Sequence, residues 1–132
     1  MMLTKHFSLS EFVRSETAEK LGIDNTPPEP TLKNIKVLAE GLEKIRAILD
    51  VPMLISSGYR SKELNRKVGG VDNSDHRTGY AADFVAPKFG SVEKICKAIK
   101  DSGIPVDQCI NELNRWVHVS FSPRMRNEHF RL

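Results

Sequence analysis

The clearest pattern in the sequence is a stripe of apolar residues between Thr31 and Asp50. Apolar side chains recur every three or four positions along this stretch, which predicts one helix with a single face to bury. The members of the stripe are Leu32, Ile35, Leu38, Leu42, Ile45 and Leu49. Pro52 follows and ends the helix. We interpret this helix as part of the core rather than as a partner-binding surface.

Capping residues predict shorter helices on both sides of this long one. The first starts at SLSEF and continues without a break to the residue before Gly22. The DNTPPEP segment after it is a rigid, non-helical connector, because its prolines remove backbone donors. A second short helix follows Ser61 over KELNRKV, and another begins at Ser91 and stops at Gly103.

Strand patterns gather later in the chain, in MLISS, YAADFVA, VDQCI and WVHVSF. The last two are joined by the polar turn NELNR and predict a hairpin. We expect a polar loop at VDNSDHRTG and an irregular tail after Pro123. Helices followed by clustered strands indicate an α+β fold, with helices packed on one face of a small antiparallel sheet.

Composition limits the possible functions. The 132 residues suit a single domain over 1–132, and 39% hydrophobic and 28% charged residues are typical of a globular protein. No stretch is apolar enough for a membrane span. The net charge of +3 suggests nucleic acid only weakly, since no basic cluster alternates with aromatics. Cys96 and Cys109 are too few for a disulfide framework, and we interpret both as buried small apolar residues.

Three side chains beside the late strands could hold a metal ion. Alternation in WVHVSF puts His118 on the more polar face, opposite Val117 and Val119. Asp83 lies in a strand that is apolar on both faces, where a carboxylate is costly unless it is paired or metal-bound. Together with His76, these residues could supply three ligands of a tetrahedral zinc and leave the fourth position for water. A structural histidine and an arginine-paired aspartate remain open alternatives at this point.

The same residues resemble a known family. SDHRTGYAAD fits Ser-x-His-x-x-Gly-x-Ala-x-Asp, the signature of zinc D-Ala-D-Ala carboxypeptidases and VanX-like dipeptidases, a family that includes phage endolysins. SSGYRS is similar to the family's Ser-Gly-Tyr-Arg segment, and WVHVSF to its Trp-x-His strand. These segments stand in the family's order, and the resemblance covers roughly residues 6 to 122. It implies a hedgehog/DD-peptidase-like fold.

The resemblance also implies roles for individual residues. His76, Asp83 and His118 match the three zinc ligands. Arg60 matches an arginine that lies near the substrate, where a guanidinium can hold a carboxylate or polarise a carbonyl oxygen. Ser74 matches a polar residue that can contact the substrate, although a serine that caps the loop is an equal alternative.

Two further residues of the hairpin enter as candidates. Trp116 shares the face of His118 and could wall the cleft. In much of the family the catalytic glutamate stands three residues before the last histidine ligand, a position that Arg115 occupies here. The nearest carboxylate is Glu112 in the predicted turn, which could act as general base to the water and then as acid to the leaving amine.

The expected activity is therefore zinc-dependent hydrolysis of peptide bonds in bacterial peptidoglycan stem peptides. A catalytically inactive, zinc-containing peptidoglycan-binding module is the alternative that Arg115 favours, and a nucleic-acid-binding accessory protein is a weaker one. The N-terminus has no apolar signal segment, so we expect synthesis in a cytoplasm and action on the cell wall after release, in a phage or bacterial setting. We expect a monomer. The bond cleaved and the choice between lysis and wall remodelling stay open.

Overall fold

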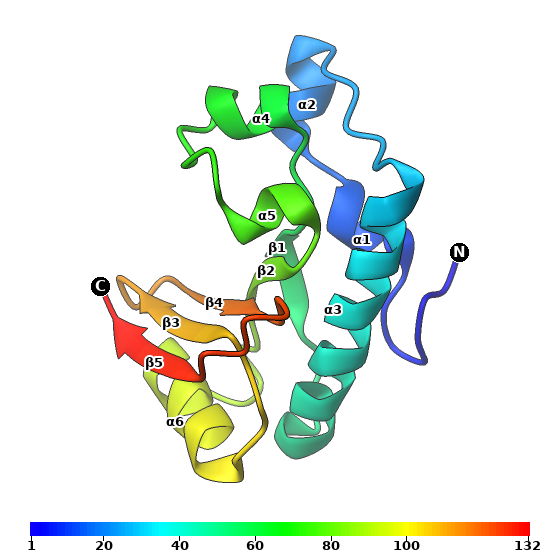
Figure 1. Ribbon diagram of the computed structural model, residues 1–132. Helices are drawn as coiled ribbons and strands as arrows, with labels where there is room; N and C mark the ends of the chain where they lie inside the picture. Colours follow the sequence, from blue (N-terminus) through cyan, green and yellow to red (C-terminus); the bar gives the residue numbers. More distant parts are fainter.

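The computed structural model describes residues 1–132, which form six helices and five strands (Figure 1). In chain order these are α1 (Leu9–Val13), α2 (Glu16–Leu21), α3 (Glu29–Leu49), β1 (Leu54–Ser57), α4 (Lys62–Lys67), α5 (Asp75–Thr78), β2 (Ala81–Val85), α6 (Val92–Ser102), β3 (Gln108–Glu112), β4 (Trp116–Ser120) and β5 (Glu128–Arg131). The predicted α+β class is confirmed. No helix combines the length and the apolar character that crossing a bilayer requires.

All five strands belong to one sheet in the order β1-β2-β4-β3-β5. The pairs among β1, β2, β4 and β3 are antiparallel, as expected, whereas β5 runs parallel to β3. Helices α3 and α6 pack on the same face of the sheet, while α2, α4 and α5 lie together at one end of the molecule (Figure 1). This end lies over β1 and β2, where the candidate site residues are found.

The core lies between α3 and α6 and one face of the sheet. The predicted stripe of α3 is confirmed, since Ile35, Leu38, Leu42 and Ile45 are fully buried in one cluster. The sheet contributes its own fully buried side chains to the same cluster: Ala82, Phe84, Val117 and Val119. Side chains alternate between the two faces of a strand, so the residues between these point away from the helices.

The N-terminal helical segment is broken, contrary to the single helix expected up to Leu21. Arg14 and Ser15 have extended backbones between α1 and α2. The Ser15 hydroxyl accepts a hydrogen bond from the Ala18 backbone N–H, which starts α2 as a new helix. Gly22 ends α2 in the left-handed region, as predicted, with φ of 66°.

Two segments expected to be irregular contain regular structure. The helix α3 begins at Glu29 and places Pro30 in its first turn, where a missing N–H costs nothing. The polar loop before β2 contains α5, a single turn whose N-cap is Ser74. A capping serine starts α5, whereas α3 extends into the proline-rich segment without a side-chain cap, because proline is allowed in the first turn of a helix.

The charged tail forms the edge strand β5 instead of an irregular end. The buried Asp107 carboxylate accepts hydrogen bonds from the backbone N–H and the guanidinium of Arg126, at 2.9–3.0 Å. This contact holds the chain beside β3, and the pairing of β5 with β3 follows directly after it. The hydrogen bonds from Arg126 hold the pKa of the Asp107 carboxyl well below its usual range.

The predicted hairpin of β3 and β4 is present and determines which face its side chains occupy. Leu113 and Asn114 have φ of 54° and 58° within the three-residue loop 113–115, which a hydrogen bond from the Arg115 N–H to the Glu112 carbonyl oxygen closes. The Asn111 side chain stabilises the turn, because its Oδ1 accepts a hydrogen bond from the Asn114 backbone N–H at 2.8 Å. Register across the hairpin pairs Ile110 with His118.

Candidate metal centre

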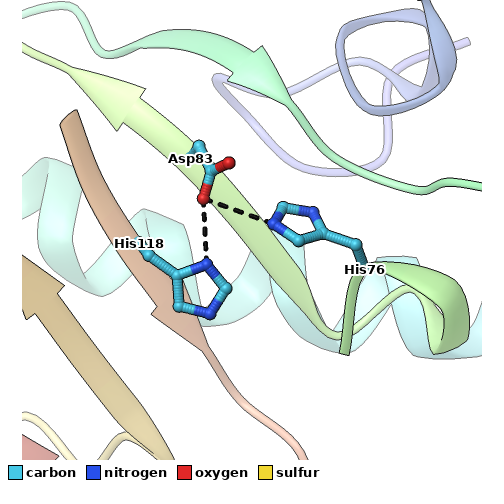
Figure 2. A group of neighbouring side chains, drawn as sticks. All are labelled: His76, Asp83 and His118. Carbon is cyan, nitrogen blue, oxygen red and sulfur yellow. Dashed lines mark hydrogen bonds and ion pairs between the residues drawn. The ribbon is translucent and has the colours of Figure 1, made fainter. Parts of the chain in front are cut away.

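His76, Asp83 and His118 converge on one point beside the sheet (Figure 2). Asp83 in β2 lies directly across from His118 in β4, so both side chains point to the same face. The His118 Nδ1 lies 2.9 Å from Asp83 Oδ1, and the His76 Nε2 lies 3.3 Å from the same oxygen. One donor atom from each residue falls within 4.8 Å of the other two.

His76 reaches this point because α5 and the strand β1 fix its ring. The Ser74 hydroxyl accepts a hydrogen bond from the His76 backbone N–H, and Gly79 ends the turn with φ of 86°. The His76 Nδ1 is 2.7 Å from the Gly58 carbonyl oxygen, to which it donates. The Nε2 on the other side of the ring faces Asp83, and metal-ligating histidines are commonly oriented by a hydrogen bond of this kind from their other ring nitrogen.

The electrostatics of the three groups favour an ionised carboxylate between two imidazoles. Burial of Asp83, which is 8% exposed, by itself raises the pKa of its carboxyl. Hydrogen bonds from His118 and His76 outweigh that effect and hold the Asp83 pKa below its usual range. Two nitrogen donors and one carboxylate oxygen at this spacing fit the ligand set of a catalytic zinc with an open position.

Arg60 lies beside these residues and carries a charge that the protein does not neutralise with a close ion pair. Its backbone N–H donates to the His76 carbonyl oxygen at 3.0 Å. Burial lowers the pKa of the guanidinium, and the Asp83 charge opposes that change. The Arg60 Nε is buried and has no hydrogen-bond partner. Because Arg60 also lines the cleft beside the centre, its guanidinium can pair there with a carboxylate or a carbonyl oxygen of a ligand.

A cleft of about 550 Å³ opens next to the metal centre. Asp83 lines the cleft together with Arg60 and Trp116, whereas the other two candidate ligands, His76 and His118, do not. The segment between α1 and α2, including Arg14, lines it as well. The helix break that the sequence did not reveal therefore contributes a wall of the cleft.

The two remaining candidates occupy different positions. Glu112 is the last residue of β3 and pairs with Trp116, so it shares the face of Trp116 and His118, although it does not line the cleft. Arg115 is exposed in the turn. Ser74 caps α5 and likewise lies outside the lining of the cleft, so its contact with a substrate stays a prediction.

Sequence reasoning missed two residues that position the centre. Gly58 supplies the carbonyl that orients His76, and a Cβ added to it would lie 2.6 Å from the Phe12 carbonyl oxygen. Asn25, in the proline-rich connector, accepts a hydrogen bond from the Ser61 N–H and donates to the Tyr59 carbonyl oxygen. The only available signal was a polar residue within an otherwise restrictive connector.

One comparison with known proteins identifies a family. The family model described as Peptidase M15 matches residues 5–120, which include all three candidate ligands, Arg60 and Glu112. No curated protein matches the chain. A match of that extent covers most of the chain, and the chain belongs to the peptidase M15 family.

Proposed function

We propose that this protein is a zinc metallopeptidase that hydrolyses peptide bonds in the stem peptides of bacterial peptidoglycan. The observation that carries the proposal is the convergence of His76, Asp83 and His118 beside a cleft in a chain of the M15 family. The family supports a peptidase with a peptide substrate, and the resemblance to D-Ala-D-Ala carboxypeptidases supports the wall peptide.

The chain's own residues have distinct tasks in this reaction. Bound zinc supplies a Lewis acid that activates water at neutral pH and polarises a carbonyl group. Arg60, which lines the cleft together with Asp83, holds a substrate carboxylate or stabilises the negative charge that develops on the scissile carbonyl oxygen. Trp116 forms a wall of the cleft and limits how the peptide can lie against Asp83.

Proton transfer is assigned to Glu112. It stands at the end of β3, across from Trp116, on the face that carries His118. From there its carboxylate can take a proton from the attacking water and return it to the leaving amine. Arg115, which occupies the usual family position, cannot accept a proton and favours a second candidate: a zinc-containing peptidoglycan-binding module without turnover.

Mass spectrometry of purified peptidoglycan after incubation with the protein separates the two candidates and identifies the bond. We expect new stem-peptide fragments with zinc, and none after chelation until zinc is added back. Binding of peptidoglycan in the presence of zinc, with no cleavage of any wall peptide, would establish the binding module instead.

Two matched pairs of variants test the assigned residues. Glu112→Gln should reduce turnover by about 10²–10⁴-fold while zinc content is retained, and Glu40→Gln, an exposed change in α3, should leave turnover unchanged. Elemental analysis should find about one zinc per chain, as a single three-ligand site requires. His118→Ala should lose that zinc and His6→Ala should not. Full activity in Glu112→Gln would remove Glu112 from the mechanism.

A further inference from the structure

A second cavity, of about 400 Å³, lies on the other face of the sheet from the metal centre. The α6, β3 and β5 elements form it, and its lining includes Cys96, Lys100, Cys109 and His129. Register pairs Cys109 with Val119, whose side chain belongs to the helix-covered core, whereas the neighbouring Ile110 pairs with His118. The sheet therefore separates the reactive side chains of this cavity from the three candidate metal ligands.

The two cysteines of the chain meet in this cavity. Both are free thiols; Cys109 is 1% exposed and Cys96 is half-buried. The neighbouring Cys109 thiol holds the pKa of Cys96 below its usual range. The neighbouring Cys96 thiol, together with burial, raises the pKa of Cys109. Cys96 is thus both the more accessible thiol and the one that ionises first.

A third group in the cavity, the imidazole of His129, can accept and pass on the proton of the buried thiol. His129 in β5 is the register partner of Cys109 in the parallel strand β3, so their side chains share a face. The His129 Nδ1 is buried and has no hydrogen-bond partner. Burial lowers the pKa of this imidazole, which favours its neutral form, and only the neutral ring has a nitrogen lone pair that can take up a proton in passing.

We propose that Cys96 and Cys109 are an oxidisable thiol pair that forms an intramolecular disulfide by exchange with a small-molecule disulfide, and that this bond stabilises the fold by tying α6 to β3. The Cys96 thiolate attacks one sulfur of the small molecule, whose S–S bond breaks and releases one half as a thiol. Cys109 attacks the Cys96 sulfur and releases the second half, and the Cys109 proton passes through His129 to the leaving sulfur, which is the stronger base. Two protein thiols are oxidised and one disulfide is reduced to two thiols.

The fold allows this bond without disturbing the metal centre. Helix α6 packs directly on β3, so the cross-link joins two elements that already touch. It would close a loop between residues 96 and 109, which restricts the unfolded chain. The thiol pair requires neither zinc nor peptidase activity, so its test is independent of the proposed function.

The experiment incubates the zinc-loaded protein with oxidised glutathione, quenches it in acid, alkylates free thiols under denaturing conditions and measures the intact mass. We expect a monomer that has lost two hydrogen atoms and carries no alkyl group, with unchanged zinc content. Its melting temperature should exceed that of the reduced protein and should fall back to the value of the reduced protein after treatment with a reductant.

Single variants resolve the order of events. Cys109→Ser should accumulate a mixed disulfide between glutathione and Cys96, whereas Cys96→Ser should react far more slowly because Cys109 is buried. A wild-type protein that keeps two alkylatable thiols, stops at the mixed disulfide or links two chains would overturn the proposal. An oxidised monomer that melts no higher than the reduced one would overturn its stabilising role. The wild-type measurements need no variant to fold.

Discussion

Asn25 joins three backbone segments that surround the candidate site. Its substitution therefore tests whether these hydrogen bonds hold the site in place. Its side-chain Nδ2 donates to the Val13 carbonyl oxygen at 2.8 Å and to the Tyr59 carbonyl oxygen at 3.1 Å. Its Oδ1 accepts from the Ser61 N–H at 2.7 Å. The residue between the last two partners is Arg60, whose own N–H donates to the His76 carbonyl oxygen.

Substitution Asn25→Ala removes all three hydrogen bonds and leaves their backbone partners unpaired. A partner that stays buried and unsatisfied costs about 1–3 kcal/mol. These sites are only partly buried, so the lower end applies and the free energy of unfolding should fall by roughly 2–4 kcal/mol. For a chain of this length that corresponds to a melting temperature lower by about 7–14 °C.

Chemical denaturation and thermal melting measure this loss, and zinc titration reports its effect on the centre. Because the Tyr59–Ser61 segment would loosen, we expect weaker zinc binding along with the lower stability. Asn34→Ala is the matched control, since it removes one exposed hydrogen bond, from Nδ2 to the Thr78 carbonyl oxygen. It should cost no more than about 1 kcal/mol. Equal losses in the two variants would refute the view that Asn25 clamps the site.

Three other substitutions probe the site and the tail. Arg60→Lys keeps the charge but loses the planar fork, so peptide turnover should fall while melting temperature and zinc content stay unchanged; equal kinetics would contradict a substrate role. Gly58→Ala should lower the melting temperature far more than Gly69→Ala, because a Cβ at Gly58 would clash with backbone atoms of Phe12, whereas at Gly69 it meets no atom and only the left-handed φ of 77° costs free energy. Asp107 has a lowered pKa in the folded state, so its stabilisation is present above the ordinary carboxyl range and is lost as pH falls below it. Denaturation curves of Asp107→Asn and the wild type should therefore differ at pH 7 and converge at acidic pH, and a constant difference would contradict this.

The elements that local pattern determines were predictable. The stripe of α3 needed only its own spacing, and the structure differs from it by two residues at the start. Alternation in β4 was enough to place His118 opposite the buried valines Val117 and Val119. The signature around His76 and Asp83 then gave the family, which the match over residues 5–120 confirms.

The features that escaped prediction all depend on contacts between distant segments. Strand β5 is charged and has no strand pattern, and it forms because Arg126 binds the buried Asp107 beside β3. The positioning role of Asn25 exists only because the connector passes next to Tyr59 and Ser61. Neither contact leaves a periodic signal, because each rests on one side chain and its backbone partners.

The three candidate ligands differ in what holds them, and this difference explains why the N-terminal segment belongs to the site. Asp83 and His118 are cross-strand partners in the register between β2 and β4. If that register shifted by one residue, the two side chains would lie on opposite faces of the sheet, and if it shifted by two residues they would no longer be neighbours. The sheet alone therefore fixes this pair. His76 is held instead by the Gly58 carbonyl, and Gly58 packs so closely on Phe12 of α1 that no Cβ fits between them. A chain that kept the three signature segments but lacked α1 would keep the pair from the sheet and lose the orientation of the third ligand.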